Sequence, residues 1–149
     1  MKNEQYNTAE TAIAIRNLFK VFGPDPQSVL PHLTDGINKA EVQKKTGHVI
    51  GLNNINIDIK SGNITVIMGL SGSGKSTLIR HINRLIEPTA GEVLLDGKNI
   101  LDLDETQLRN LRQTRMSMVF QKFALLPHRT VLQNTCLLYT SDAADEYDR

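Results

Sequence analysis

Three apolar runs in the first half of the chain have the spacing of β-strands. Residues 11–21 carry a series of Ala, Ile and Leu side chains and predict a first strand. Residues 55–60 alternate apolar with polar side chains, which predicts a second strand with one face in water. Residues 64–68 are apolar and mostly β-branched, as expected of a strand buried in a parallel sheet.

The segment after residue 75 has helical periodicity instead. Its apolar positions recur about once a turn, which predicts a helix that Pro88 ends. His81 is assigned to the polar face of this helix and is interpreted as a solvated side chain with no catalytic role. The apolar stripe consists of Leu78, Ile79, Ile82, Leu85 and Ile86.

Residues 24–47 interrupt the predicted strands with a polar stretch. A Gly-Pro-Asp-Pro sequence breaks the chain at its start. Two short helices are predicted, at residues 27–33 and 39–46, and Asn38 with Glu41 has the spacing of a capping box for the second. Gly47 is expected to end that helix. The stretch is therefore expected to be an insertion outside the core.

Residues 69–76 have the sequence Gly-Leu-Ser-Gly-Ser-Gly-Lys-Ser and match the phosphate-binding pattern G-x-x-x-x-G-K-[ST], between a predicted strand and a predicted helix. Glycines let successive backbone N–H groups point inward, and the free N–H groups at a helix start favour anions. Lys75 supplies a charge for the β- and γ-phosphates, and the Ser76 hydroxyl is suited to ligate Mg²⁺. The alternative is a Gly/Ser-rich turn with a solvated lysine. The candidate nucleotide-binding residues are Gly69, Ser71, Gly72, Ser73, Gly74, Lys75, Ser76 and Thr77.

The apolar run at residues 91–97 has two interpretations. It ends in Asp96, as does a strand that presents a magnesium-organising aspartate (Walker B). Gly97 follows directly, however, and an Asp-Gly hairpin turn explains the aspartate without a metal. The hairpin is the favoured interpretation.

A helix and a strand are predicted next. Asp104 and Gln107 have the spacing of a capping box, which predicts a helix from there through Arg112. Residues 116–120 are mostly apolar and predict another buried strand.

Composition narrows the class of protein. The chain has 149 residues, 40% of them hydrophobic, which is enough for one domain with a core. It contains neither a long apolar span nor a signal-like start, so a cytoplasmic location is expected. A net charge of +1 with scattered basic residues gives no reason to expect nucleic-acid binding.

The two ends of the chain are expected to lie outside the domain, which is assigned to residues 11–135. Residues 1–10 are polar and predicted to be disordered. Residues 136–149 resemble the translation of a sequencing adapter and are interpreted as a non-native tail. A native acidic tail is the alternative. The tail holds Cys136, the one cysteine of the chain, so the remainder suits a reducing compartment.

Read together, the phosphate-binding loop, Phe22 and Gln121 resemble the first half of an ATP-binding-cassette (ABC) ATPase. The resemblance implies an α/β P-loop NTPase fold, a RecA-like core with an antiparallel β subdomain. Phe22 matches the aromatic position that stacks on adenine in that family, although an aromatic ring here also suits a core or a strand edge. Gln121 matches the glutamine whose amide reaches Mg²⁺ and the attacking water, so Lys75 and Gln121 are the expected catalytic residues, and Ser76 and Gln121 the metal ligands.

Within that superfamily the chain resembles ATP-binding subunits of glycine betaine/proline betaine (quaternary amine) importers, which serve osmoprotection. The supporting strings lie at residues 67–70, 83–89 and 118–131, and the insertion at about 24–47 is typical of that family. The resemblance implies ATP and Mg²⁺ as cofactors, a homodimer of ATPase subunits, and transmembrane permease subunits with a substrate-binding protein as partners. It places the protein at the inner face of the cell membrane as a peripheral subunit.

Other functions have weaker sequence support. A methionine or other amino-acid importer subunit shares most of these motifs, and the insertion disfavours it. A small P-loop kinase or GTPase would call for a guanine-reading Asn-Lys-x-Asp string or an Arg-rich lid, and neither is visible in the sequence. A non-transport cassette protein of repair or translation is disfavoured by the residues around Gln121.

The family's signature motif, its Walker B aspartate with the catalytic glutamate, and its switch histidine lie downstream of the position of Gln121. The chain ends before them, and His128 is too near Gln121 to be that histidine. The chain is therefore expected to be an N-terminal fragment, truncated before the signature motif and Walker B and without the family's regulatory domain. Such a fragment is expected to bind phosphates without hydrolysing ATP, and to be poorly stable.

Overall fold

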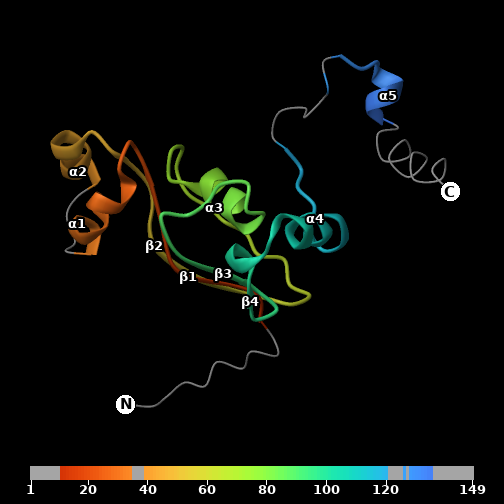
Figure 1. Ribbon diagram of the computed structural model, residues 1–149, viewed down its shortest axis with the longest axis horizontal. Helices are drawn as coiled ribbons and strands as arrows, with labels where there is room; N and C mark the ends of the chain where they lie inside the picture. The colour runs from red at the N-terminus through yellow and green to blue at the C-terminus, as the bar shows by residue number, and fades with distance from the viewer. Residues whose placement is uncertain (1–10, 35–38, 121–125, 127, 136–149) are drawn as a thin grey trace, which may run out of the picture. The chain divides into compact units, whose positions relative to one another are not determined.

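The computed structural model describes residues 11–34, 39–120, 126 and 128–135 (Figure 1). The chain divides into two units, Met1–Ser117 and Met118–Arg149, and each is described by itself. The strands of the first unit are β1 (Thr11–Phe22), β2 (Val49–Lys60), β3 (Ala90–Leu95) and β4 (Lys98–Asn99). Its helices are the 3-10 helices η1 (Pro26–Val29) and η2 (Ile100–Asp102) and the α-helices α1 (Leu30–Thr34), α2 (Lys39–Thr46), α3 (Lys75–Ile82) and α4 (Glu105–Thr114).

The four strands form one antiparallel sheet in the order β2-β1-β3-β4. β1 coincides with the predicted first strand. β2 begins at Val49, earlier than the sequence predicts, because it continues to pair with β1 beyond an irregularity at Asn54, whose φ is 49°. Past that point its side chains alternate between half-buried and exposed, as the sequence predicts.

β3 and β4 form a hairpin whose turn contains Asp96 and Gly97. Both residues have positive φ, 48° and 77°, as a tight two-residue hairpin turn requires. The Asp96 carboxylate accepts a hydrogen bond of 2.7 Å from the Arg115 guanidinium. The structure therefore confirms the turn interpretation of this aspartate.

The prediction of strands at residues 64–68 and 116–120 is wrong for this structure. Both runs lack secondary structure, and neither pairs with a strand in the described part of the chain. Ile64 and Val119 are 95% and 96% exposed. A parallel strand gains its hydrogen bonds and its burial from neighbours on both sides, so apolar composition alone does not form one.

The predicted P-loop helix is shorter than expected. α3 ends at Ile82, so Leu85 and Ile86 lie outside it, ahead of Pro88. Arg84 has a left-handed conformation, with φ at 49°, which a continuing helix does not allow. Its guanidinium then donates to the carbonyls of Ile100 and Leu103 in and beside η2.

The insertion packs on the sheet instead of lying outside the core, which corrects the sequence interpretation. It contains η1, α1 and α2, and Gly47, with φ at 71°, ends α2 as predicted. Asn38, half of the predicted capping box, lies outside the described residues. Buried side chains from the insertion and from β1 form one apolar cluster, which contains Phe19, Val21, Val29, Leu33 and Val42.

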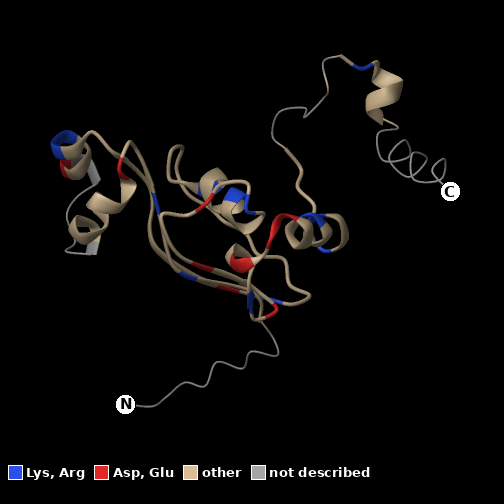
Figure 2. Ribbon diagram, in the orientation of Figure 1, with Lys and Arg blue, Asp and Glu red and all other residues tan. Residues whose placement is uncertain are grey.

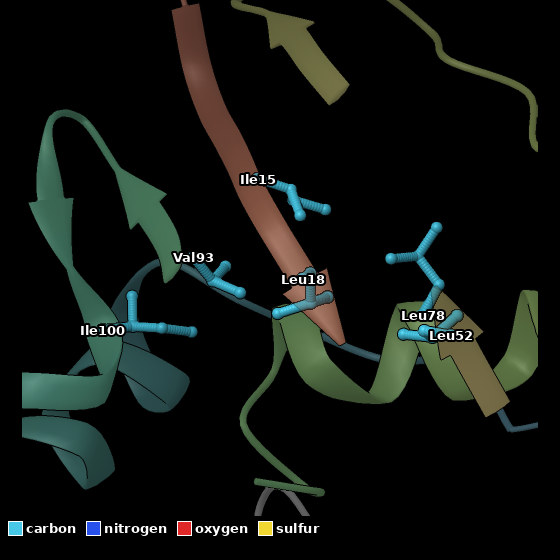
Figure 3. Packing of buried hydrophobic residues seen from close by; sticks show 6 residues of the cluster. All are labelled: Ile15, Leu18, Leu52, Leu78, Val93 and Ile100. Carbon is cyan, nitrogen blue, oxygen red and sulfur yellow. The ribbon is translucent and has the colours of Figure 1, made fainter. Parts of the chain in front are cut away.

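A second apolar cluster forms the main core between the sheet, α3 and η2 (Figure 3). Leu78 is its member from α3, which fixes the helix that follows the phosphate-binding loop to the sheet. Leu18 and Phe19, neighbours on β1, belong to different clusters, because successive strand residues point to opposite faces. The cluster consists of Ile15, Leu18, Leu52, Leu78, Val93 and Ile100.

α4 begins as the sequence predicts. The Asp104 carboxylate accepts from the Gln107 amide N–H at 2.8 Å, and the Gln107 side chain accepts from the Asp104 amide N–H at 3.1 Å. In the second unit α5 (Val131–Thr135) has no counterpart in the sequence prediction. The start of α5 has the same reciprocal capping bonds. The Gln133 side chain accepts from the Thr130 amide N–H, and the Thr130 hydroxyl accepts from the Gln133 amide N–H.

α2, β2 and α4 each carry both basic and acidic residues, and α2 has three lysines in its sequence (Figure 2). No helix in the described ranges is long and apolar enough to cross a membrane.

Candidate functional site

The phosphate-binding loop leads directly into α3. Gly74 precedes the helix in a left-handed conformation, with φ at 96°, and its carbonyl accepts from the Leu78 amide at 2.8 Å. A Cβ at Gly74 would lie 2.6 Å from the carbonyl oxygen of Gly51 on β2. Both the backbone conformation and this close approach therefore require glycine.

Lys75 folds back over the loop. Its Nζ donates to the carbonyls of Gly69 and Leu70, each at 2.7 Å, and lies 3.4 Å from Oγ of Ser73. The ammonium group is thus held among the loop's own oxygen atoms. A phosphate that reached this point would meet a full positive charge beside the start of α3.

The remaining loop residues present small polar groups. The side chains of Ser71, Ser73 and Ser76 are exposed, and Gly72 has φ at 77°. Thr77 is half-buried in the first turn of α3. Among the described residues no group of three His, Cys, Asp or Glu side chains could hold a metal. A hydroxyl oxygen such as that of Ser76 suits a hard cation such as Mg²⁺, and the role of Ser76 as a metal ligand stays a prediction.

Phe22 ends β1, and 40% of its surface is exposed. Its ring lies against Gly51, since a Cβ built there would be 2.8 Å from Cε2 of Phe22. Gly51 in turn approaches Gly74 through its carbonyl. The structure therefore brings the exposed aromatic ring and the loop to the same part of β2, and stacking on a base stays a prediction.

His81 is fully buried, with 0% exposure, so its assignment as a solvated residue is wrong. Its Nδ1 lies 2.7 Å from the Thr77 carbonyl oxygen and must donate, because a carbonyl only accepts. Its Nε2 is buried without a partner in the described structure. Burial lowers the pKa of His81 below 6.5, and the charge of Lys20 acts in the same direction.

The sequence did contain a signal for this burial. Positions 78, 81 and 82 have the i, i+3, i+4 spacing of one helix face. Ile79, which was assigned to the apolar stripe, is 39% exposed instead. Because the predicted apolar face of the helix included only hydrophobic residues, the prediction assigned this buried histidine to the solvent-exposed face.

Two further residues of the sequence interpretation lie beyond the first unit. Gln121, the predicted catalytic glutamine and metal ligand, is outside the described residues, so its role stays a prediction. His128 is exposed.

The geometry of the loop agrees with a family comparison. Residues 52–149 match the family model described as ABC transporter. The chain belongs to the ABC transporter family. The match begins at Leu52 on β2 and takes in the loop at residues 69–76, α3 and the hairpin, so this ABC transporter chain has the cassette ATPase fold.

Curated relatives refine the comparison. The glycine betaine/proline betaine transport system ATP-binding protein ProV of Escherichia coli (strain K12) is 49% identical over 123 residues, which are 83% of this chain and 31% of the relative. The methionine import ATP-binding protein MetN of Staphylococcus haemolyticus is 50% identical over 90 residues, 60% of this chain and 26% of the relative. This ABC transporter chain thus spans about a third or less of the length of these relatives.

A solved structure has a similar fold. The dimeric structure of MJ0796, described as a bacterial ABC transporter cassette, matches with a TM-score of 0.63 and 34% identity. The match covers 84% of this ABC transporter chain and 45% of the other chain.

Proposed function

We propose that this chain binds ATP together with Mg²⁺ through residues 69–77, as part of the ATP-binding subunit of an importer for glycine betaine or related quaternary amines. The position of Lys75 carries the proposal. Its ammonium group lies beside the start of α3 and donates to the Gly69 and Leu70 carbonyls of the loop whose N–H groups would surround a bound phosphate. A lysine whose ammonium group was fully solvated would not donate to two carbonyls of the loop.

The chain's own groups act by position and charge. The loop amides and the free N–H groups at the start of α3 hold the phosphate oxygens, and Lys75 exchanges a loop carbonyl for the β- and γ-phosphates. The Ser76 hydroxyl is the proposed magnesium ligand, and Gln121 the proposed second one, which also orients the attacking water. The metal, when bound, neutralises charge that develops on the transferred phosphoryl group.

The proposal for the whole protein rests on family membership. Two ATPase subunits would enclose ATP between them, and the pair would drive transmembrane permease subunits from the inner face of the membrane, with a substrate-binding protein delivering the solute. Coupled ATP hydrolysis is part of this proposal. The betaine class is favoured over methionine because the betaine relative aligns over 83% of the chain and the methionine relative over 60%.

Lys75→Ala tests the ATP site. We expect the dissociation constant for ATP with Mg²⁺, measured by calorimetry, to rise about tenfold or more, because a charge-assisted bond to phosphate is lost. Lys98→Ala is the matched control, an exposed lysine on the β3–β4 hairpin, and should leave the constant unchanged. Equal ATP binding by the Lys75→Ala variant, or none by the unmodified chain, would contradict the proposed site.

Two further measurements test the activity and the solute. We expect the 149-residue chain alone to show no magnesium-dependent ATPase rate; a rate that Lys75→Ala abolishes would overturn this expectation. Uptake of labelled betaine by a complete transporter that contains this subunit supports the betaine class. Uptake of methionine alone would favour the alternative importer.

A further inference from the structure

Gly51 contacts both the exposed aromatic ring and the phosphate-binding loop. A Cβ at Gly51 would lie 2.8 Å from Cε2 of Phe22 and 3.4 Å from the Lys20 carbonyl. On the loop side, the Gly51 carbonyl oxygen would lie 2.6 Å from a Cβ at Gly74. One residue of β2 therefore separates the ring from the start of α3.

At position 51, a side chain would be opposed by contact with its neighbours and not by backbone strain. Gly51 is not one of the glycines with positive φ. An alanine would thus keep the strand conformation, and its methyl group would meet the ring. Because the Phe22 ring is 40% exposed, it has room to move away, so the strand can accept the methyl group.

The ring has two further supports. The Lys20 ammonium lies 5.2 Å from the Phe22 ring centroid and is itself held by the Glu87 carbonyl at 2.7 Å. His48 holds the turn that follows the ring. Its Nε2 accepts from the Asp25 amide at 3.3 Å, and its Nδ1 donates to the Thr46 carbonyl at 2.8 Å.

His48 also adjoins the ring through the sheet. It directly precedes Val49, the residue that pairs with Phe22 across β1 and β2. A Cβ at Gly23 would lie 2.2 Å from Cδ2 of His48, so the imidazole lies directly against the residue after Phe22. The imidazole therefore fixes the backbone on both sides of the strand pair at this end.

We propose that Gly51 is a positioning residue for the nucleotide base, which holds the Phe22 ring at a fixed distance from the phosphate-binding loop, and that His48 assists it by fixing the turn after the ring. This inference rests on the proposed ATP site. It deepens that function by assigning base recognition to residues that do not touch the phosphates.

Paired ligands separate the base from the phosphates. We compare dissociation constants for ATP and for inorganic tripolyphosphate, both with Mg²⁺, in the unmodified chain and in Phe22→Ala, Gly51→Ala and the double variant. Gly51→Ala should weaken ATP binding about tenfold, the scale of one lost aromatic–base stack, and change tripolyphosphate binding less than twofold. The double variant should bind ATP no more weakly than Phe22→Ala, because the methyl group acts only through the ring.

Every other outcome of these binding measurements contradicts either this inference or the proposed function. Gly51→Ala overturns the inference if it weakens both ligands equally, leaves ATP binding unchanged, or adds its full effect to that of Phe22→Ala. If Phe22→Ala leaves ATP binding unchanged, the inference fails while the phosphate site stands. If the unmodified chain binds neither ligand, the proposed function fails and this inference with it.

His48 variants provide an independent arm should Gly51→Ala not fold. His48→Ala should show a smaller loss of the same kind, for ATP and not for tripolyphosphate. His48→Gln should recover part of it, because the glutamine oxygen can accept from the Asp25 amide. His32→Ala is the matched control, an exposed histidine in α1, and should bind both ligands normally. Equal losses for both ligands in His48→Ala, or no recovery in His48→Gln, would overturn its assisting role.

Discussion

His81 couples the helix after the phosphate-binding loop to the pH of the solution. It is buried in α3 and bonded to the Thr77 carbonyl, one turn from the loop. The charged groups that act on it are Lys20 on β1 and Glu87 after the helix. Burial dominates and lowers the pKa of the imidazole, so the folded protein keeps His81 neutral at a pH where the unfolded chain protonates it.

The sign of the resulting pH dependence follows from this difference. The unfolded state binds the extra proton, so the contribution of His81 is complete above about pH 6.5 and is lost as the pH falls from there toward the folded-state pKa. We expect His81→Leu to lose less stability than the unmodified chain between pH 8 and pH 5.5, measured by urea unfolding at each pH. The exposed His32→Leu serves as control. An equally steep loss in His81→Leu would contradict this account.

At the scale of residues, the sequence is most informative where a motif fixes the spacing of the side chains, and the binding role of these residues stays a prediction. The loop glycines and Lys75 were identified because their spacing is itself the signal. His81 was missed because its burial depends on tertiary packing, and Gly51 because its approach to the ring of Phe22 joins residues far apart in the chain.

At the scale of elements, α4 is held at its start by side chains that lie close in sequence. Asp104→Ala removes the acceptor for the Gln107 amide, and the loss of such a cap costs about 1 kcal/mol. We expect the urea midpoint to fall accordingly, with the slope unchanged. Asp102→Ala is the control, because Asp102 is exposed and precedes the helix, and its substitution removes the same charge. An equal effect of both substitutions would assign the loss to charge and not to capping.

Elements formed as predicted where their signals are local. The capping box of α4, the turn at Asp96 and the stop at Gly47 each depend on residues a few positions apart. The strands predicted at residues 64–68 and 116–120 did not form, because parallel pairing needs partners far away in the chain. The early start of β2 was missed for a related reason, since β1 sets its pairing beyond Asn54.

At the scale of the whole molecule, an apolar stretch is open to solvent. Ile64, Val66, Met68 and Leu70 are between 70% and 95% exposed. Extended apolar segments with free backbone groups pair readily with other chains. We expect the 149-residue chain to self-associate at micromolar concentrations, in sedimentation velocity.

Val66→Asp tests this stretch. We expect it to shift the chain toward monomer while the melting temperature changes by no more than a few degrees, because Val66 is 70% exposed. Gln113→Asp adds the same charge on an exposed face of α4 and should leave association unchanged. A monomeric unmodified chain with a cooperative thermal transition would contradict the prediction.

The folded-back conformation of Lys75 has a consequence for ligand choice. Its ammonium group already bonds two carbonyls, so an incoming anion must replace acceptors that the protein itself supplies. The net gain is therefore the difference between two well-bonded arrangements. A lone sulfate offers fewer acceptor oxygens than a polyphosphate, which presents several of them to the amides and the ammonium at once. If the loop binds phosphates as proposed, it therefore selects for the longer anion.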